Sequence, residues 1–135
     1  MGKQGQTIGD EKFDERLDNL VRIRFEIGGY FGGMERRTLT FEGEQIVVER
    51  EGFNGFMPEL DSVEHYVGKT RTSFINGLKE LHIGRWKEDY CDPGILDGTQ
   101  WHLVMDFADQ GSVESGGSNA YPKNFKRFLD LMEMK

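Results

Sequence analysis

Large apolar residues recur at every second position near the C-terminal end of the chain, with polar residues beside or between them. This period of two is typical of a β-strand with one buried face. The pattern predicts burial of Trp101, Leu103, Met105 and Phe107 and exposure of the polar neighbours Gln100 and His102.

The chain after this strand changes its period. A turn is expected at residues 109–111, and beyond Pro122 the apolar residues follow the spacing i, i+3, i+4, i+7. That spacing predicts a closing helix with one apolar stripe, formed by Phe125, Phe128, Leu129 and Met132. Chain ends fray unless they are tied down, so we expect this helix to be part of the folded core.

A second alternation, at residues 21–27, predicts a strand with Val21, Ile23, Phe25 and Ile27 inward. The following segment, GGYFGG, contains two glycine pairs that give the backbone access to positive φ, so it predicts a hairpin connection. The return strand is expected at residues 35–41, followed by a turn at 42–44 and a third strand at 45–50. Three successive antiparallel strands form a meander.

Residues 51–60 are expected to form a loop with three large apolar side chains, Phe53, Phe56 and Met57. Packing under the loop and an exposed apolar patch are both open interpretations. Alternation at residues 62–68 fits a fourth strand, and a helical turn capped at Asp61 is the alternative.

A further helix is predicted after a threonine cap at Thr70 or Thr72. Its apolar stripe consists of Phe74, Ile75, Leu78 and Leu81. Gly77 weakens a helix by about 1 kcal/mol relative to Ala, and we expect it to be tolerated because it allows close packing against the sheet.

Two other segments each have two interpretations. Trp86 and Tyr90, four residues apart in a charged stretch, fit either a last helical turn or a braced loop. Phe13, Leu17 and Leu20 fit either a short helix or a flexible lead-in.

These patterns predict an α+β fold, an antiparallel sheet of five or six strands with two helices packed on one face. Strands with one polar side argue against a doubly wound parallel sheet, whose strands are continuously apolar. The length of 135 residues predicts a single domain, residues 1–135, in which the polar, glycine-rich residues 1–10 are flexible. Only 36% of the residues are hydrophobic, but ten of them are Phe, which adds core volume.

The formal net charge of −7 restricts the expected partners. An acidic surface repels phosphate groups, so we expect neither nucleic acid nor an anionic membrane as a partner, whereas a basic protein partner is electrostatically allowed. A lone cysteine, Cys91, forms no internal disulfide. No apolar run reaches the roughly 18–20 residues of a membrane span, and no secretory signal is apparent, so we expect a cytoplasmic protein.

Several segments together resemble an uncharacterised family of small bacterial proteins and lipoprotein domains. They are GGYFGG, the W-x-x-x-Y of Trp86 and Tyr90, DGTQWHLVMDF and SGGSNAYPKNF. In that family a DG-x-x-W strand precedes a G-x-N-x-Y-P turn and a terminal helix. The match is best from Trp86 onward. It rests on structural residues, so it implies the fold and lends no activity.

The outward positions of the first two strands carry Arg22, Arg24 and Arg36. Three guanidinium groups on one sheet face are able to grip a carboxylate or phosphate. In a chain of net charge −7, pairing with surface carboxylates is the simpler interpretation.

His102 and Asp106 share the polar face of the C-terminal strand. Four residues along a strand correspond to about 13 Å, too far for joint metal binding without a further ligand. No other spacing of His or Cys residues indicates a metal site, so the sequence predicts neither metal nor organic cofactor. Cys91 lies among acidic residues, whose negative charge disfavours a thiolate nucleophile.

Asn119 ends a Ser-Gly-Gly-Ser-Asn segment that superficially resembles a phosphate-binding loop. It lacks the lysine pattern of such loops. The favoured interpretation is a turn into the closing helix, with Asn119 satisfying free backbone N–H groups.

The leading functional hypothesis is a small, acidic, non-catalytic binding or interaction module. It rests on the lack of a nucleophile–base pair, a ligand cluster and a cofactor motif in the sequence. The alternative is a small hydrolase whose catalytic groups are dispersed in the sequence and meet only in the fold.

Overall fold

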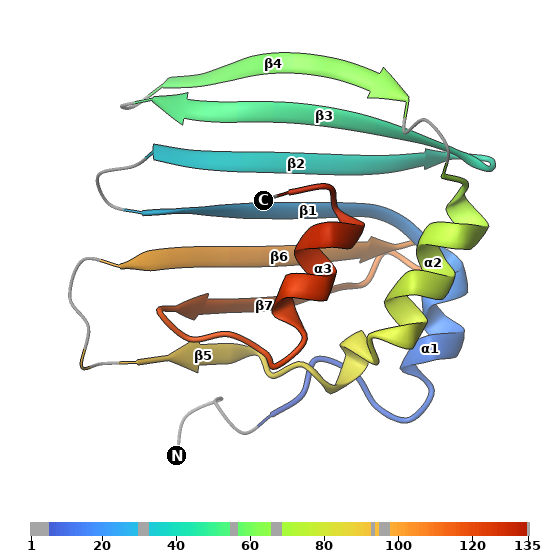
Figure 1. Ribbon diagram of the computed structural model, residues 1–135. Helices are drawn as coiled ribbons and strands as arrows, with labels where there is room; N and C mark the ends of the chain where they lie inside the picture. The colour runs from blue at the N-terminus through green and yellow to red at the C-terminus, as the bar shows by residue number, and fades with distance from the viewer. Residues whose placement is uncertain are drawn as a thin grey trace.

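The structure, a computed structural model, describes residues 6–29, 33–54, 57–65, 69–92, 94 and 98–134, of which 53, 54 and 57–65 are described by their backbone alone. One sheet dominates it, with the strand order β4-β3-β2-β1-β6-β7-β5 (Figure 1). The strands are β1 Leu20–Gly29, β2 Gly33–Glu42, β3 Gln45–Asn54, β4 Met57–His65, β5 Asp89–Cys91, β6 Thr99–Phe107 and β7 Ser112–Ser118. The helices are α1 Phe13–Arg16, α2 Arg71–Glu80 and α3 Phe125–Leu131, with 3₁₀ turns at Leu17–Asn19 and Ile83–Arg85.

The α+β class is confirmed, but the predicted sheet was wrong in strand number and in strand direction. The described residues form seven strands, and β5 runs parallel to β7 while the other pairs are antiparallel. A strand of three residues is too short to show a period in the sequence. β5 forms the edge of the sheet, and β7 lies between β5 and β6, the strand that follows β5 in the chain.

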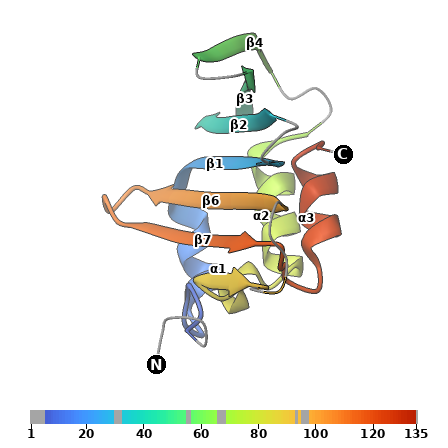
Figure 2. The same cartoon turned by 90° about the vertical axis from the view of Figure 1, so that its left-hand side faces the viewer.

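The helices α2 and α3 lie on the same side of the sheet (Figure 2). The ring of Phe128 on α3 lies 5.0 Å from that of Phe25 on β1, and Phe74 on α2 lies 5.9 Å from Phe41 on β2. The predicted alternation in β6 is confirmed, with Trp101, Leu103, Met105 and Phe107 buried and Gln100 and His102 exposed. The core therefore fills the space between this sheet face and the helices.

The inward set of β1 differs from the prediction at one position. Val21 is 41% exposed, whereas Leu20 is buried. The register between β1 and β6 shifts between Leu20 and Arg22, as a β-bulge does. The extra residue turns Val21 outward, and the regular alternation begins only at Ile23.

The predicted loop at residues 51–60 was wrong for the part that the structure describes. β3 continues to Asn54 and β4 begins at Met57, so the two form one long hairpin. The segment predicted as a strand or a helical turn at 62–68 is strand as far as His65, and its remaining residues lie outside the described ranges. The predictions about the side chains of Phe53, Phe56 and Met57 also fall outside the description.

The structure shows where α1 and α2 begin and which element α2 packs against at Gly77. Thr70 caps α2, its hydroxyl accepting a hydrogen bond from the Ser73 backbone N–H at 3.1 Å. Residues 13–16 form a helical turn and not a flexible lead-in, and Phe13 is buried. A Cβ at Gly77 would lie 2.8 Å from Leu131 Cδ1, so the close packing is against α3 and not the sheet.

Trp86 is buried in the core beyond the last helical turn, and it links α2 to α3. Its indole Nε1 donates to Asn124 Oδ1 at 2.8 Å, and Asn124 Nδ2 donates to the Leu81 carbonyl at 2.6 Å. Tyr90 lies on β5, with its ring 5.8 Å from that of Trp101. Neither aromatic residue extends α2.

Candidate functional site

Neither α2 nor α3 covers the other face of the sheet (Figure 2). The outward residues of β1, β2, β6 and β7 lie on this open face because side chains alternate across a strand. The cross-strand register places Glu26 between His102 on β6 and Arg36 on β2. The open face is therefore a polar surface whose layout is fixed by the register of the four strands.

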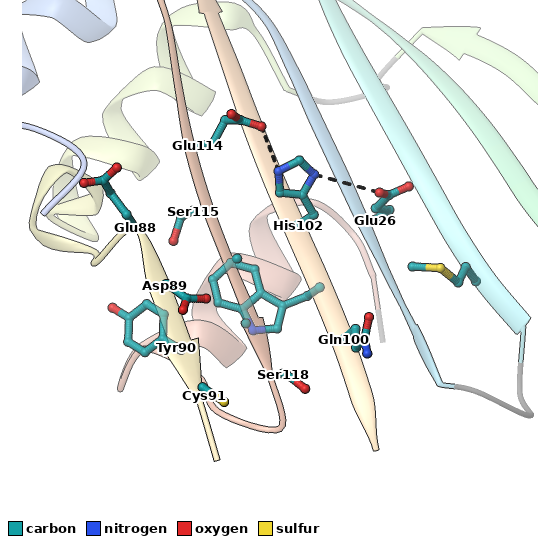
Figure 3. Close-up of a pocket in the computed structure, with 14 residues that line it drawn as sticks. Glu26, Glu88, Asp89, Tyr90, Cys91, Gln100, His102, Glu114, Ser115 and Ser118 are labelled. Atoms are coloured by element: carbon teal, nitrogen blue, oxygen red, sulfur yellow. Dashed lines mark hydrogen bonds and ion pairs between the residues drawn. The ribbon is translucent and has the colours of Figure 1, made fainter. Parts of the chain in front are cut away.

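A line of charged side chains crosses the open face from β3 to β7. Arg36 lies 3.3 Å from Glu26 and 3.7 Å from Glu51. The imidazole of His102 lies between two carboxylates, with Nε2 2.9 Å from Glu114 Oε1 and Nδ1 3.9 Å from Glu26 Oε1 (Figure 3). The side chain of His102 is 46% exposed, so solvent reaches this line.

Two arginines share one carboxylate at the other end of the open face. Arg22 Nε donates to Asp106 Oδ2 at 3.0 Å, while the Arg24 guanidinium lies 3.8 Å from the same oxygen. Like Arg36, both arginines thus pair with acidic side chains of neighbouring strands, in accord with the simpler interpretation of the sequence. Exposed pairs of this kind contribute about 0–1 kcal/mol each.

A hollow of about 440 Å³ opens between β5 and β6, where β7 presents Gly116 between Asp89 and His102. Glycine has no side chain to fill the space, so the walls stand about 10 Å apart by strand spacing. Four carboxylates line it, namely Glu26, Glu88, Asp89 and Glu114 (Figure 3). Its charge is thus predominantly negative.

Tyr90 also lines the hollow. Burial raises the pKa of the Tyr90 phenol above its ordinary value, and the hydrogen bond that its oxygen accepts from the Lys87 backbone N–H at 2.9 Å partly offsets this. The free thiol of Cys91 is exposed at the same wall. The hollow therefore contains polar groups of several kinds, with carboxylates the most numerous among the charged ones.

The structure brings five of the six predicted site residues onto the open face. Arg36 joins His102 through Glu26, and Arg22 and Arg24 meet at Asp106. These five lie in one region because β1 occupies the middle of the sheet, between β2 and β6.

Asn119 does not belong to this group, and the prediction that it forms the turn into the closing helix was wrong. It follows β7 with a φ of 59°, and its backbone N–H donates to the Thr99 carbonyl at 2.9 Å. The preceding residues Ser115–Ser118 are strand and not loop, and α3 begins only at Phe125 with Asn124 as its N-cap residue. The segment therefore forms neither a helix entry nor a phosphate-binding loop.

The residues that sequence reasoning missed are the acidic ones around His102. Glu114 lies two positions before Gly116, and Glu88 and Asp89 lie in or beside β5. Alternation alone places Glu114 outward, but it gives no information about which residue on another strand lies opposite. Glu88 and Asp89 could have been assigned to this site only if β5 had been recognised in the sequence.

Comparisons with protein-family models, with curated proteins and with solved structures find no match for this chain. Within the described ranges, no set of three or more His, Cys, Asp or Glu side chains is arranged to hold a metal ion. No helix in the described part of the chain combines the length and apolar character needed to cross a bilayer.

Proposed function

We propose that the protein is a non-catalytic interaction module whose open sheet face binds a partner protein through a segment rich in Lys and Arg. The observation that carries this proposal is the acidic hollow beside His102. Among the described residues, no lysine or arginine forms an ion pair with Glu88, Asp89 or Glu114. Glu114 contacts His102, which adds no positive charge while the imidazole is neutral, so these carboxylates can accept a cation from outside the chain.

The electrostatics of the whole chain favour the same class of partner. A net charge of −7 attracts a basic surface at long range, and the hollow supplies a defined place for its cations. Complementary charge of this kind speeds association and selects partners more than it adds affinity. We therefore expect binding that is fast and sensitive to salt.

The binding test uses a fluorescent Lys/Ser peptide and its Glu/Ser counterpart, titrated with the protein at low and high salt. The double variant Glu114→Gln/Asp89→Asn should weaken Lys/Ser binding about three- to tenfold, the effect of losing two partly screened ion pairs. The matched control is Glu80→Gln/Asp130→Asn, which removes the same charge from positions on α2 and α3, away from the open face.

The two double variants separate a local site from the general effect of net charge. Equal losses in both would refute the assignment to the open face. Failure of the Lys/Ser peptide to bind more tightly than the Glu/Ser peptide would refute a basic partner.

A small hydrolase is the second candidate, and the contact between His102 and Glu114 favours it. A carboxylate 2.9 Å from an imidazole nitrogen orients the ring as in a general base. The nearest thiol in the hollow, Cys91, lies two strands across and two residues along from His102, which is about 12 Å by strand geometry. Turnover of chromogenic esters or phosphates that disappears in His102→Gln would favour the enzyme over the module.

A further inference from the structure

The charge of His102 decides how many carboxylates beside the hollow remain available to a cation from outside the chain. Its two ring nitrogens face opposite ways along the line of charges, one toward Glu114 and the other toward Glu26 (Figure 3). A neutral imidazole has one N–H donor and one bare nitrogen, whereas an imidazolium has two donors. Neutral His102 therefore satisfies one carboxylate, and protonated His102 satisfies both.

The charged and titratable groups around His102 come from five strands. They are Glu26 and Arg24 on β1, Arg36 on β2, Asp106 on β6, Glu114 on β7, and Asp89, Tyr90 and Cys91 with the adjacent Glu88 at β5. Among the carboxylates of this set, Glu26 and Glu114 each have an oxygen within 4 Å of a ring nitrogen of His102. Arg24 is paired with Asp106, and Arg36 lies beyond Glu26.

We infer that protonation of His102 switches the proposed docking face from a cation-accepting to a self-paired state. This inference rests on the proposed function and adds its regulation. With His102 neutral, Glu26 is paired with Arg36, and the negative charge of Glu114 beside the hollow is not compensated by a described cation. With His102 protonated, the pairs Glu114–His102–Glu26–Arg36–Glu51 form one continuous line across five strands.

The direction of the switch follows from the charge change. Histidine side chains gain their proton between about pH 8 and pH 5, so acidification adds a positive charge next to the site of the partner's cation. That charge repels the partner and occupies the carboxylates that would hold it. Binding of a basic segment is therefore strong at neutral pH and weaker at mildly acidic pH.

The test measures fluorescence anisotropy of the Lys/Ser peptide at about pH 7.5 and about pH 5.5, with ionic strength held constant. Native protein should bind about three- to tenfold more weakly at the lower pH, the effect of one added, partly screened charge. His102→Gln retains a hydrogen-bonding side chain but cannot gain charge, so its affinity should be nearly the same at both pH values.

His82→Asn is the matched control. His82 is exposed in a left-handed conformation, with a φ of 52°, where Asn is tolerated. This variant should keep the pH dependence of the native protein. A pH dependence that persists in His102→Gln would overturn the inference.

The outcomes for the two proposals are distinguishable. Absence of Lys/Ser binding at about pH 7.5 would refute the proposed function together with its regulation. Binding at that pH with equal affinity at the lower pH would refute the switch alone and leave the docking face supported.

Discussion

Replacing Phe128 by Ala tests whether the short closing helix supports the fold. Phe128 is fully buried, with an exposed fraction of 0%. Its ring makes edge-to-face contacts with Phe25 at 5.0 Å and with Trp86 at 5.1 Å, and it stacks near Phe125 at 6.4 Å. The substitution therefore opens a cavity where α3 meets the sheet and the segment that follows α2.

The expected loss in free energy of unfolding follows from these contacts. A buried Phe→Ala change costs about 3–5 kcal/mol in free energy of unfolding. Each close aromatic pair contributes about 0.5–1.5 kcal/mol beyond its buried area, and Phe128 makes two such pairs at the favourable geometry. We therefore expect a loss near the upper end, about 4–5 kcal/mol, which is a large part of the roughly 5–15 kcal/mol typical of a domain.

Urea unfolding followed by tryptophan fluorescence measures this loss. Lys126→Ala, at an exposed position of the same helix, is the control and should change stability by less than about 0.5 kcal/mol. If Phe128→Ala is too unstable to titrate, Phe128→Leu, which keeps part of the apolar volume, should still show a measurable loss. A loss below about 1.5 kcal/mol for Phe128→Ala, or a cooperatively folded monomer after deletion of residues 122–135, would refute the reasoning.

Three other outcomes are expected. Gly117→Ala should destabilise the protein by about 1–3 kcal/mol in urea unfolding, because its Cβ would lie 2.5 Å from both Trp101 Nε1 and the Ala120 carbonyl oxygen. Gly29→Ala, whose Cβ would lie 3.8 Å from its nearest neighbour, should leave the stability almost unchanged. Hydrogen bonds from Thr72 lower the pKa of Glu44, so Glu44→Gln should destabilise the protein at neutral pH. The difference in stability between native protein and variant should vanish as the pH falls below 4.5 and through the lowered pKa of Glu44. Thermal melts with and without a strong chelator should superimpose, and a fall in Tm of many degrees would contradict the prediction of a metal-free fold.

The parts of the fold that sequence predicts well are those where one face of an element meets the core. In β6 the burial of Trp101 and the exposure of His102 follow from alternation, since a slip of one residue would reverse both. The stripe of α2 and its cap at Thr70 are predictable for the same reason, because they depend only on local spacing. Such patterns specify which side of each element faces inward.

The parts that sequence fails to predict depend on features without a period. Val21 fits the alternation of β1, yet the bulge beside Leu20 turns it outward. The segment of β3 and β4 lacks clear alternation around residues 51–60, so a loop was the expected structure, although backbone pairing with neighbouring strands makes it a hairpin. Three-residue β5 gives no pattern at all.

The candidate site shows why a sequence predicts which face of a strand is buried but does not predict which residues of other strands lie opposite it. A shift of β6 against β1 by two residues would leave every buried side chain of β6 buried, because the side-chain period is two. It would nevertheless place Arg24 or Gly28, in place of Glu26, opposite His102. The same apolar pattern would then give a histidine without its second carboxylate, and the pH response inferred for the open face would be lost. The contact between His102 and Glu26 is thus a property of the β1–β6 register, which joins residues 76 positions apart, and no pattern within either strand contains it.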